Sequence, residues 1–270
     1  MGLFTERHEV IAKVVRKITL GKLDFRTESV IQRYKKKLSK RIATSKDYTV
    51  ESGCFKGLRL AKSKGWAEED AGTQCLGLYE KEVIDCLEDI QRKRRARYLI
   101  DIGGADGYFA LGALVSGLFE NVIVYEADGH LRERLRKQAE ENRVLEKLTI
   151  RGMVTEAELL EVVRQIGASC VILCDIEGGE YEIMTTRLIK AIKKIPTIIE
   201  LHRFTDEMKI LFSELRQRIE KEGGVFIQTK GRDLSSMAEL DLWSDHERAL
   251  LISESRCHFG TWAFLPGSKE

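Results

Sequence analysis

The stretch Tyr98–Phe109, with the sequence YLIDIGGADGYF, decides how the rest of the chain is expected to fold. An apolar run typical of a buried strand leads into a glycine-rich turn, and the turn leads into an apolar helix. Glycines permit positive φ angles and allow a ligand to approach the backbone closely. In open α/β sheets, ligands bind outside the carboxyl ends of the strands, where this turn would lie. The stretch therefore predicts a ligand site at one edge of an α/β sheet.

Short apolar segments alternate with helical segments along the rest of the chain, which indicates strands joined by helical crossovers and hence parallel pairing. No clear helix separates the last two strands, although residues 236–251 have partial helical character, so we expect a closing antiparallel hairpin. The predicted fold is α/β, with a Rossmann-like, doubly wound, mostly parallel seven-stranded sheet. We expect strands at Tyr98–Ile102, Val122–Glu126, Leu148–Arg151, Cys170–Asp175, Thr197–Leu201, Val225–Gln228 and Thr261–Leu265, and helices at Tyr108–Leu118, Gly129–Arg143, Glu156–Ile166, Glu180–Lys194 and Asp206–Glu222.

The first hundred residues differ in character from the rest. Apolar residues recur at helical spacing in Glu9–Ile18, Ser29–Ile42 and Leu76–Ile90, whereas residues 48–73 are rich in Gly, Lys and Ser and are expected to be irregular. We therefore predict a mostly helical N-terminal extension over residues 1–97, acting as a cap over an acceptor or as an oligomerisation element. Residues 98–270 are predicted to form the ligand-binding domain. The oligomeric state is not predicted.

Charge and cysteine usage limit the class of protein. The 270 residues include 45 basic and 43 acidic side chains, and this balance gives no reason to expect a nucleic acid partner. The six cysteines form no CxxC pair, which favours free thiols in a reducing compartment. Residues 1–17 lack the apolar core of a signal peptide, and no segment approaches the length of a spanning helix. We expect a cytoplasmic protein without a membrane partner.

The acids beside the glycine turn indicate the charge of the ligand. Asp101 precedes the first glycine, the spacing is not G-x-G-x-x-G, and no P-loop lysine is present. A carboxylate here suits the cationic amino group of S-adenosylmethionine, whereas Asp101 and Asp106 would repel a pyrophosphate. The next strand ends at Glu126, where a carboxylate accepts ribose hydroxyls, as it also does in NAD enzymes. The predicted cofactor-binding residues are Asp101, Gly103, Gly104, Ala105, Asp106, Gly107, Tyr108, Glu126, Ala127 and Asp175.

Two later segments extend this pattern. Residues 174–182 read CDIEGGEYE, and residues 197–202 read TIIELH. With the glycine turn and Glu126, they resemble the FkbM-like family of class I methyltransferases. That family shows Asp-x-Glu-Gly-x-Glu after the fourth strand and an acid followed by His or a similar polar group at the fifth. The resemblance covers about residues 98–204. The chain departs from it at Ala105, in the middle of the glycine turn, and after the strand-two acid, where the family usually has a proline and this chain has Ala127-Asp128.

The resemblance implies a class I methyltransferase fold and transfer of a methyl group from S-adenosylmethionine. The usual acceptor is an oxygen of a small molecule such as a sugar or a natural product. Nucleic-acid amino-methyltransferases carry an Asn/Asp-Pro-Pro-aromatic motif after the fourth strand, which this chain lacks. We therefore expect a small-molecule acceptor, whose identity is not predicted.

Methyl transfer requires an aligned acceptor and removal of its proton. His202 is the predicted base, because the ordinary pKa of histidine lies near neutrality. Glu177 and Glu180 are the other predicted catalytic residues, although carboxylates at a helix N-terminus are also explained by the helix dipole. Carboxylates and a histidine at one edge would suit a divalent ion. The family pattern does not demand a metal, and none is predicted.

Two other functions remain open. The basic run Arg92–Arg97 would contact phosphates in an RNA methyltransferase, or it forms a solvated surface. A non-catalytic protein that binds S-adenosylmethionine would keep the cofactor site and show no turnover.

Overall fold

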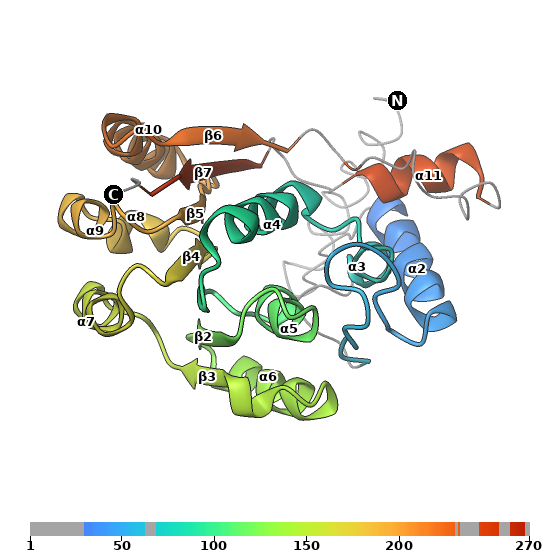
Figure 1. The fold of residues 1–270 in the computed structure, drawn as a ribbon. Helices are drawn as coiled ribbons and strands as arrows, with labels where there is room; N and C mark the ends of the chain where they lie inside the picture. The colour runs from blue at the N-terminus through green and yellow to red at the C-terminus, as the bar shows by residue number, and fades with distance from the viewer. Residues whose placement is uncertain (1–29, 63–68, 230–231, 233–242, 254–259, 268–270) are drawn as a thin grey trace, which may run out of the picture.

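A computed structural model of the chain describes residues 30–62, 69–229, 232, 243–253 and 260–267. Its centre is a seven-stranded sheet with the order β3-β2-β1-β4-β5-β7-β6 (Figure 1). The strands are β1 (Tyr98–Ile102), β2 (Asn121–Tyr125), β3 (Leu148–Arg151), β4 (Cys170–Cys174), β5 (Thr197–Glu200), β6 (Val225–Gln228) and β7 (Thr261–Leu265). Strand β7 lies antiparallel to both β5 and β6, and the other pairings are parallel. The predicted fold class and the closing hairpin are confirmed.

Helices cover both faces of the sheet and give three layers (Figure 1). One face packs against α4 (Lys81–Arg94), α5 (Tyr108–Val115) and α6 (Gly129–Glu141). The other packs against α7 (Glu156–Ile166), α8 (Glu180–Ile183), α9 (Thr186–Ala191) and α10 (Asp206–Lys221). A short 3₁₀ helix, η1 (Leu145–Lys147), precedes β3.

Side chains alternate between these two faces along every strand. On β1, Leu99 belongs to the core beneath α4–α6, and Ile100 and Ile102 belong to the core beneath α7–α10. Asp101 therefore points toward the face that α4–α6 cover. The same alternation places Trp262 of β7 in the first core, where it is fully buried.

The predicted helix over Glu180–Lys194 is wrong in one respect, because two helices replace it. Helix α8 ends at Ile183, and Thr185 adopts an extended conformation from which its hydroxyl accepts the backbone N–H of Leu188. A side-chain oxygen in this position caps a new helix. Met184 lies between the two helices, and its carbonyl oxygen accepts a hydrogen bond from the Arg218 side chain of α10.

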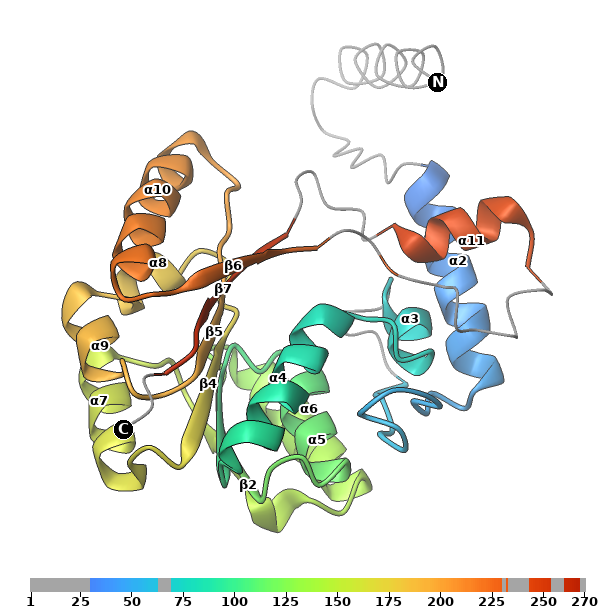
Figure 2. The ribbon, with the colours of Figure 1, turned by 45° about the horizontal axis from the view of Figure 1, so that its top comes forward.

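A small helical group stands beyond the carboxyl ends of the parallel strands (Figure 2). It consists of α2 (Val30–Ser45), α3 (Ala71–Cys75) and α11 (Asp245–Ile252), so it joins segments far apart in the sequence. Its core contains Leu38, Ile42, Leu76, Leu78 and Leu251. The predicted helix over residues 9–18 lies outside the described residues.

The main hydrophobic core crosses the predicted division at residue 97. Phe55 and Leu87 pack in the same cluster as Leu99 and Val124 of the sheet. The loop from α3 to α4 also brings Tyr79 against Tyr108 at the start of α5, with the ring centroids 5.3 Å apart. Among the described helices, none combines the length and the apolar character needed to cross a membrane.

Candidate functional site

The glycine turn joins three strands at their carboxyl ends. The N–H of Gly103 donates to the carbonyl of Tyr125 in β2 at 2.8 Å, and the N–H of Asp175 donates to the carbonyl of Ile102 in β1 at 2.8 Å. Gly103 has φ +100°, and a Cβ atom added there would lie 1.7 Å from the carbonyl oxygen of Asp175. Glycine is therefore required at this position for contact between chain segments, before any ligand is considered.

Glu126, which follows β2, is hydrogen-bonded to the glycine turn that follows β1. One of its carboxylate oxygens accepts the N–H of Ala105 at 2.8 Å, and the other accepts the N–H of Asp128 at 2.8 Å. Ala105 has φ +42°, a conformation that favours glycine. The two hydrogen bonds hold the carboxylate at the mouth of the crevice, and each oxygen keeps a lone pair for a further donor.

A cavity of about 320 Å³ opens at this edge of the sheet. Six of the predicted site residues line it: Gly103, Ala105, Glu126, Ala127, Asp175 and Glu177. The remaining lining residues are Ile102, Tyr125, Leu131, Gly152, Met153, Val154, Ile176, Gly179, Glu182 and Ile183. Four of the lining side chains are carboxylates, and no lysine or arginine is among the described residues that line the cavity.

Four predicted cofactor residues support the turn instead of lining the cavity. A Cβ atom added to Gly104 would lie 2.2 Å from a methyl group of Val124, and one added to Gly107 would lie 2.4 Å from Leu135. Asp106 lies 3.2 Å from the guanidinium of Arg134. Tyr108 packs edge-on against Phe55 and Tyr79. These contacts with neighbouring side chains account for the presence of these four residues in the turn. Their direct contact with a ligand stays a prediction.

Asp101 is also absent from the cavity lining. Its side chain is 2% exposed and points toward the face covered by α4–α6. Burial raises its pKa to about 7, the charge of Glu126 adds to the rise, and a hydrogen bond from the Ala110 backbone opposes it. Ala110 lies in the first turn of α5, so Asp101 accepts a hydrogen bond from the N-terminal end of that helix and stabilises it. Its predicted contact with a ligand ammonium is untested.

The residues after β3 belong to the site and were missed. Gly152, Met153 and Val154 follow β3 directly and line the cavity. The rule that ligands bind beyond the carboxyl ends of parallel strands applies to β3 as it does to β1 and β2. That rule would have indicated these residues, although no acid or glycine motif marks them.

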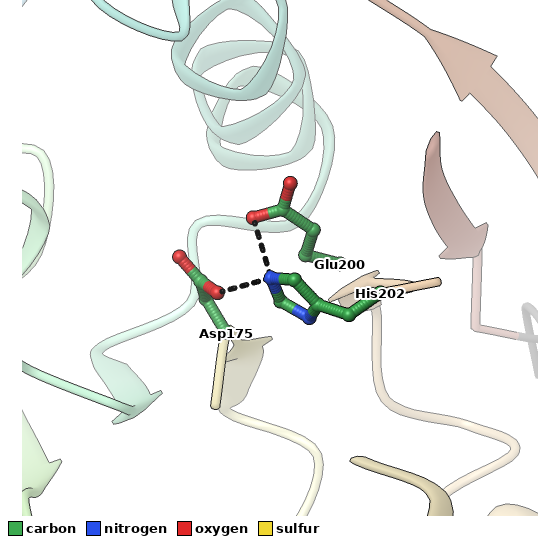
Figure 3. Close-up of side chains that lie close together, drawn as sticks. All are labelled: Asp175, Glu200 and His202. Atoms are coloured by element: carbon green, nitrogen blue, oxygen red, sulfur yellow. Dashed lines mark ion pairs between the residues drawn. The ribbon is translucent and has the colours of Figure 1, made fainter. Parts of the chain in front are cut away.

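A second group of polar side chains adjoins the cavity through Asp175. Strand register pairs Cys174 with Ile199, so Asp175 and Glu200 come next to each other, and His202 follows two residues later on the same face. Nε2 of His202 lies 3.5 Å from Asp175 and 3.6 Å from Glu200 (Figure 3). The acid that follows β4 and the acid and histidine at the end of β5 therefore lie close together at one edge of the sheet.

Glu180 holds the imidazole of His202 in place. One of its carboxylate oxygens accepts the backbone N–H of His202 at 2.8 Å and lies 3.1 Å from Nδ1 of the ring. The other oxygen accepts the N–H of Gly178 at 2.7 Å. The hydroxyl of Tyr181 donates to the carbonyl of His202. Because Glu180 is fully buried, it orients His202 and does not reach the cavity.

The group is strongly acidic. Burial raises the pKa of Asp175 well above its usual range, and the charges of Glu200 and Glu80 raise it further. Burial alone would lower the pKa of His202, but the hydrogen bond with Glu180 and the charge of Glu200 outweigh it and raise the pKa. Burial also raises the pKa of Tyr79, which the charges of Glu80 and Asp70 raise further. A positive charge at His202, or beside it, is therefore favoured.

Comparisons with known proteins give a distant likeness. No protein-family model matches the chain, and no curated protein matches it. An O-methyltransferase from Bacillus cereus, solved in complex with SAH, is 12% identical, with 89% of this chain and 93% of that chain covered and a TM-score of 0.45. Cofactor-bound Rv0187 from MTB is 11% identical, with 91% and 94% covered and a TM-score of 0.46. The O-methyltransferase TomG from Streptomyces achromogenes, in complex with SAM, is 13% identical, with 87% and 90% covered and a TM-score of 0.44.

Proposed function

We propose that this protein is an S-adenosylmethionine-dependent methyltransferase. The observation that carries the proposal is the charge of the cavity at the carboxyl ends of β1, β2 and β4. Carboxylates of Glu126, Asp175, Glu177 and Glu182 line it without a lysine or arginine among its described lining residues. Such a cavity attracts a cationic ligand and repels a phosphate. S-adenosylmethionine carries a sulfonium and an ammonium group, whereas NAD carries a pyrophosphate.

The residues present fit this cofactor. Glu126 stands at the end of β2, where a carboxylate accepts the two hydroxyls of a ribose. Ala127, Leu131 and Val154 supply an apolar wall for an adenine ring. Asp175 supplies a carboxylate for the methionine end, in a position that Asp101 does not reach. The cavity volume of about 320 Å³ lies at the lower end of the range for small-molecule sites.

The bound cofactor would supply an electrophilic methyl group, and the chain would position an acceptor and take up its proton. Asp175 lines the cavity and also faces His202, so an acceptor hydroxyl beside Asp175 would lie next to the acidic group. Glu177 lies 3.4 Å from Nε2 of His202 and also lines the cavity. We propose that Glu177 contacts the acceptor and that Glu180 positions His202 beside it. The FkbM-like resemblance favours a hydroxyl of a small molecule as the acceptor.

Calorimetry with S-adenosylmethionine tests the cofactor site. The wild-type protein is expected to bind one molecule per chain, and Glu126→Ala is expected to bind about 10- to 100-fold more weakly, because it loses charge-assisted hydrogen bonds. The matched control is Glu120→Ala. Glu120 is an exposed carboxylate paired with Arg97 just before β2, at the opposite edge of the sheet.

Circular dichroism would first establish that both variants are folded. Equal affinities for Glu126→Ala and Glu120→Ala would contradict the proposed site. Binding of NAD in place of S-adenosylmethionine would contradict the proposed cofactor.

The geometry does not favour the alternative of an RNA methyltransferase that uses the basic run. Arg92–Arg94 end α4, and Arg97 directly precedes β1, at the amino end of that strand. The cavity lies at the carboxyl end of the same strand, about 16 Å away for five residues at 3.3 Å each. RNA bound to the run would therefore be held at the edge of the sheet that faces away from the cavity.

A further inference from the structure

We propose that Asp175, Glu200 and His202 bind a divalent transition-metal ion, with Mn²⁺ as the best match. Binding of the ion stands on the geometry of these three residues alone, whereas its role in the reaction rests on the proposed function. The three residues come from the carboxyl ends of neighbouring strands β4 and β5, and their side chains point toward one another (Figure 3).

The distances suit ligands that share one ion. Nε2 of His202 lies 3.5 Å from Asp175 and 3.6 Å from Glu200, and the three ligand atoms lie within 4.8 Å of one another. Atoms bound to one ion at about 2.1–2.3 Å, in tetrahedral or adjacent octahedral positions, lie about 3.0–3.8 Å apart. The observed contacts are too long for strong hydrogen bonds.

The hydrogen bonding of Asp175 leaves room for a ligand at the oxygen that faces His202. One oxygen of Asp175 is buried and has no hydrogen-bond partner in the described part of the chain, and it is the oxygen that faces Nε2. The His202 side chain is 7% exposed. A proton on Nε2 would draw one carboxylate to about 2.7–2.9 Å, which none of the carboxylates around Nε2 approaches.

Glu180 has the position expected of a residue that supports a metal-binding histidine. Its carboxylate lies 3.1 Å from Nδ1 of His202. With the hydrogen of the ring on Nδ1, the lone pair of Nε2 points at Asp175, Glu177 and Glu200. A lone pair facing carboxylates is repulsive unless a cation lies between them. Histidines that bind metals usually donate their other N–H to a carboxylate in this way.

The donor set selects the kind of ion. Carboxylates alone suit Mg²⁺ and Ca²⁺, whereas imidazole suits transition metals. One imidazole with two carboxylates therefore favours Mn²⁺ or a similar ion over Mg²⁺. The ion would lie beside the cavity, because Asp175 belongs to both. In the proposed methyltransferase it would lower the pKa of an acceptor hydroxyl that it binds.

The test is titration of EDTA-treated, dialysed full-length protein with Mn²⁺, followed by the electron paramagnetic resonance signal of the free ion. We expect one tightly bound Mn²⁺ per chain and at least tenfold weaker binding in Asp175→Asn and in Glu200→Gln. The matched control is Glu207→Gln, an exposed carboxylate at the start of α10, which follows His202 by a few residues. Equal binding in all four proteins, or no bound Mn²⁺ in the wild type, would overturn the proposal.

A second measurement on the wild type keeps the test decisive if a variant does not fold. Pulsed electron paramagnetic resonance of bound Mn²⁺ should show nitrogen coupling from one imidazole, and its absence would overturn the assignment of His202. Calorimetry with S-adenosylmethionine in EDTA separates the two proposals. Cofactor binding without Mn²⁺ binding would overturn only the metal site, whereas Mn²⁺ binding without cofactor binding would contradict only the proposed function.

Discussion

Gly103→Ala is expected to destabilise the fold by about 3 kcal/mol or more, or to prevent folding. A Cβ atom there would lie 1.7 Å from the carbonyl oxygen of Asp175 and 2.9 Å from Ile176, and φ is +100°. The first of these neighbours is backbone, so relief requires moving the end of β4 away from β1. Urea unfolding followed by circular dichroism would measure the loss of free energy.

Gly117→Ala is the control for backbone strain without a steric clash. Gly117 has φ +69°, and a Cβ atom added there would meet nothing within 4 Å. We expect this variant to lose about 1 kcal/mol, the usual cost of a left-handed conformation in a residue with a Cβ atom. Equal losses in the two variants would show that close packing between β1 and β4 does not explain Gly103.

Asp101→Asn is expected to stabilise the protein by about 2–4 kcal/mol at pH 8. The pKa of Asp101 is raised from 3.8 to about 7 by burial and by the charge of Glu126. A raised pKa means that the folded state binds the proton more tightly, so this stability is fully present below about pH 4 and is lost as the pH rises toward 7. The asparagine side chain is neutral and still accepts a hydrogen bond from the Ala110 backbone.

The measurement is the free energy of unfolding from urea titrations at pH 5, 6, 7 and 8. The difference between Asp101→Asn and wild type should grow with pH. Asp128→Asn is a control of opposite sign, because hydrogen bonds from the backbone of His130 and Leu131 lower the pKa of Asp128. Its carboxylate stabilises the fold above the ordinary pKa and not below it. A difference for Asp101→Asn that does not vary with pH would contradict the raised pKa.

The same variant separates two roles for Asp101. If this carboxylate contacts the ammonium group of the cofactor, calorimetry of Asp101→Asn should show an affinity for S-adenosylmethionine reduced as much as in Glu126→Ala. If Asp101 supports α5 from below, as its burial indicates, the affinity should change much less than in Glu126→Ala.

Much of the fold could be predicted from the sequence, because its signals are local. Apolar runs with strand propensity, separated by helical periodicity, place β1, β3, β6 and β7 at the residues expected of them. Glu126 and Asp175 could also be predicted as site residues, since an acid that ends a parallel strand must lie at the carboxyl edge. Both line the cavity.

Tertiary structure decided the rest. The face to which Asp101 points depends on which core each side of β1 packs against, so a position inside the motif did not bring it into the cavity. The contact of Glu180 with His202 joins the start of α8 to the segment after β5, 22 residues later, and strand register sets their distance. Met153 became a lining residue because β3 ends beside β2. Periodicity along a chain specifies elements, whereas register and crossover direction specify which side chains meet, and those depend on the whole core.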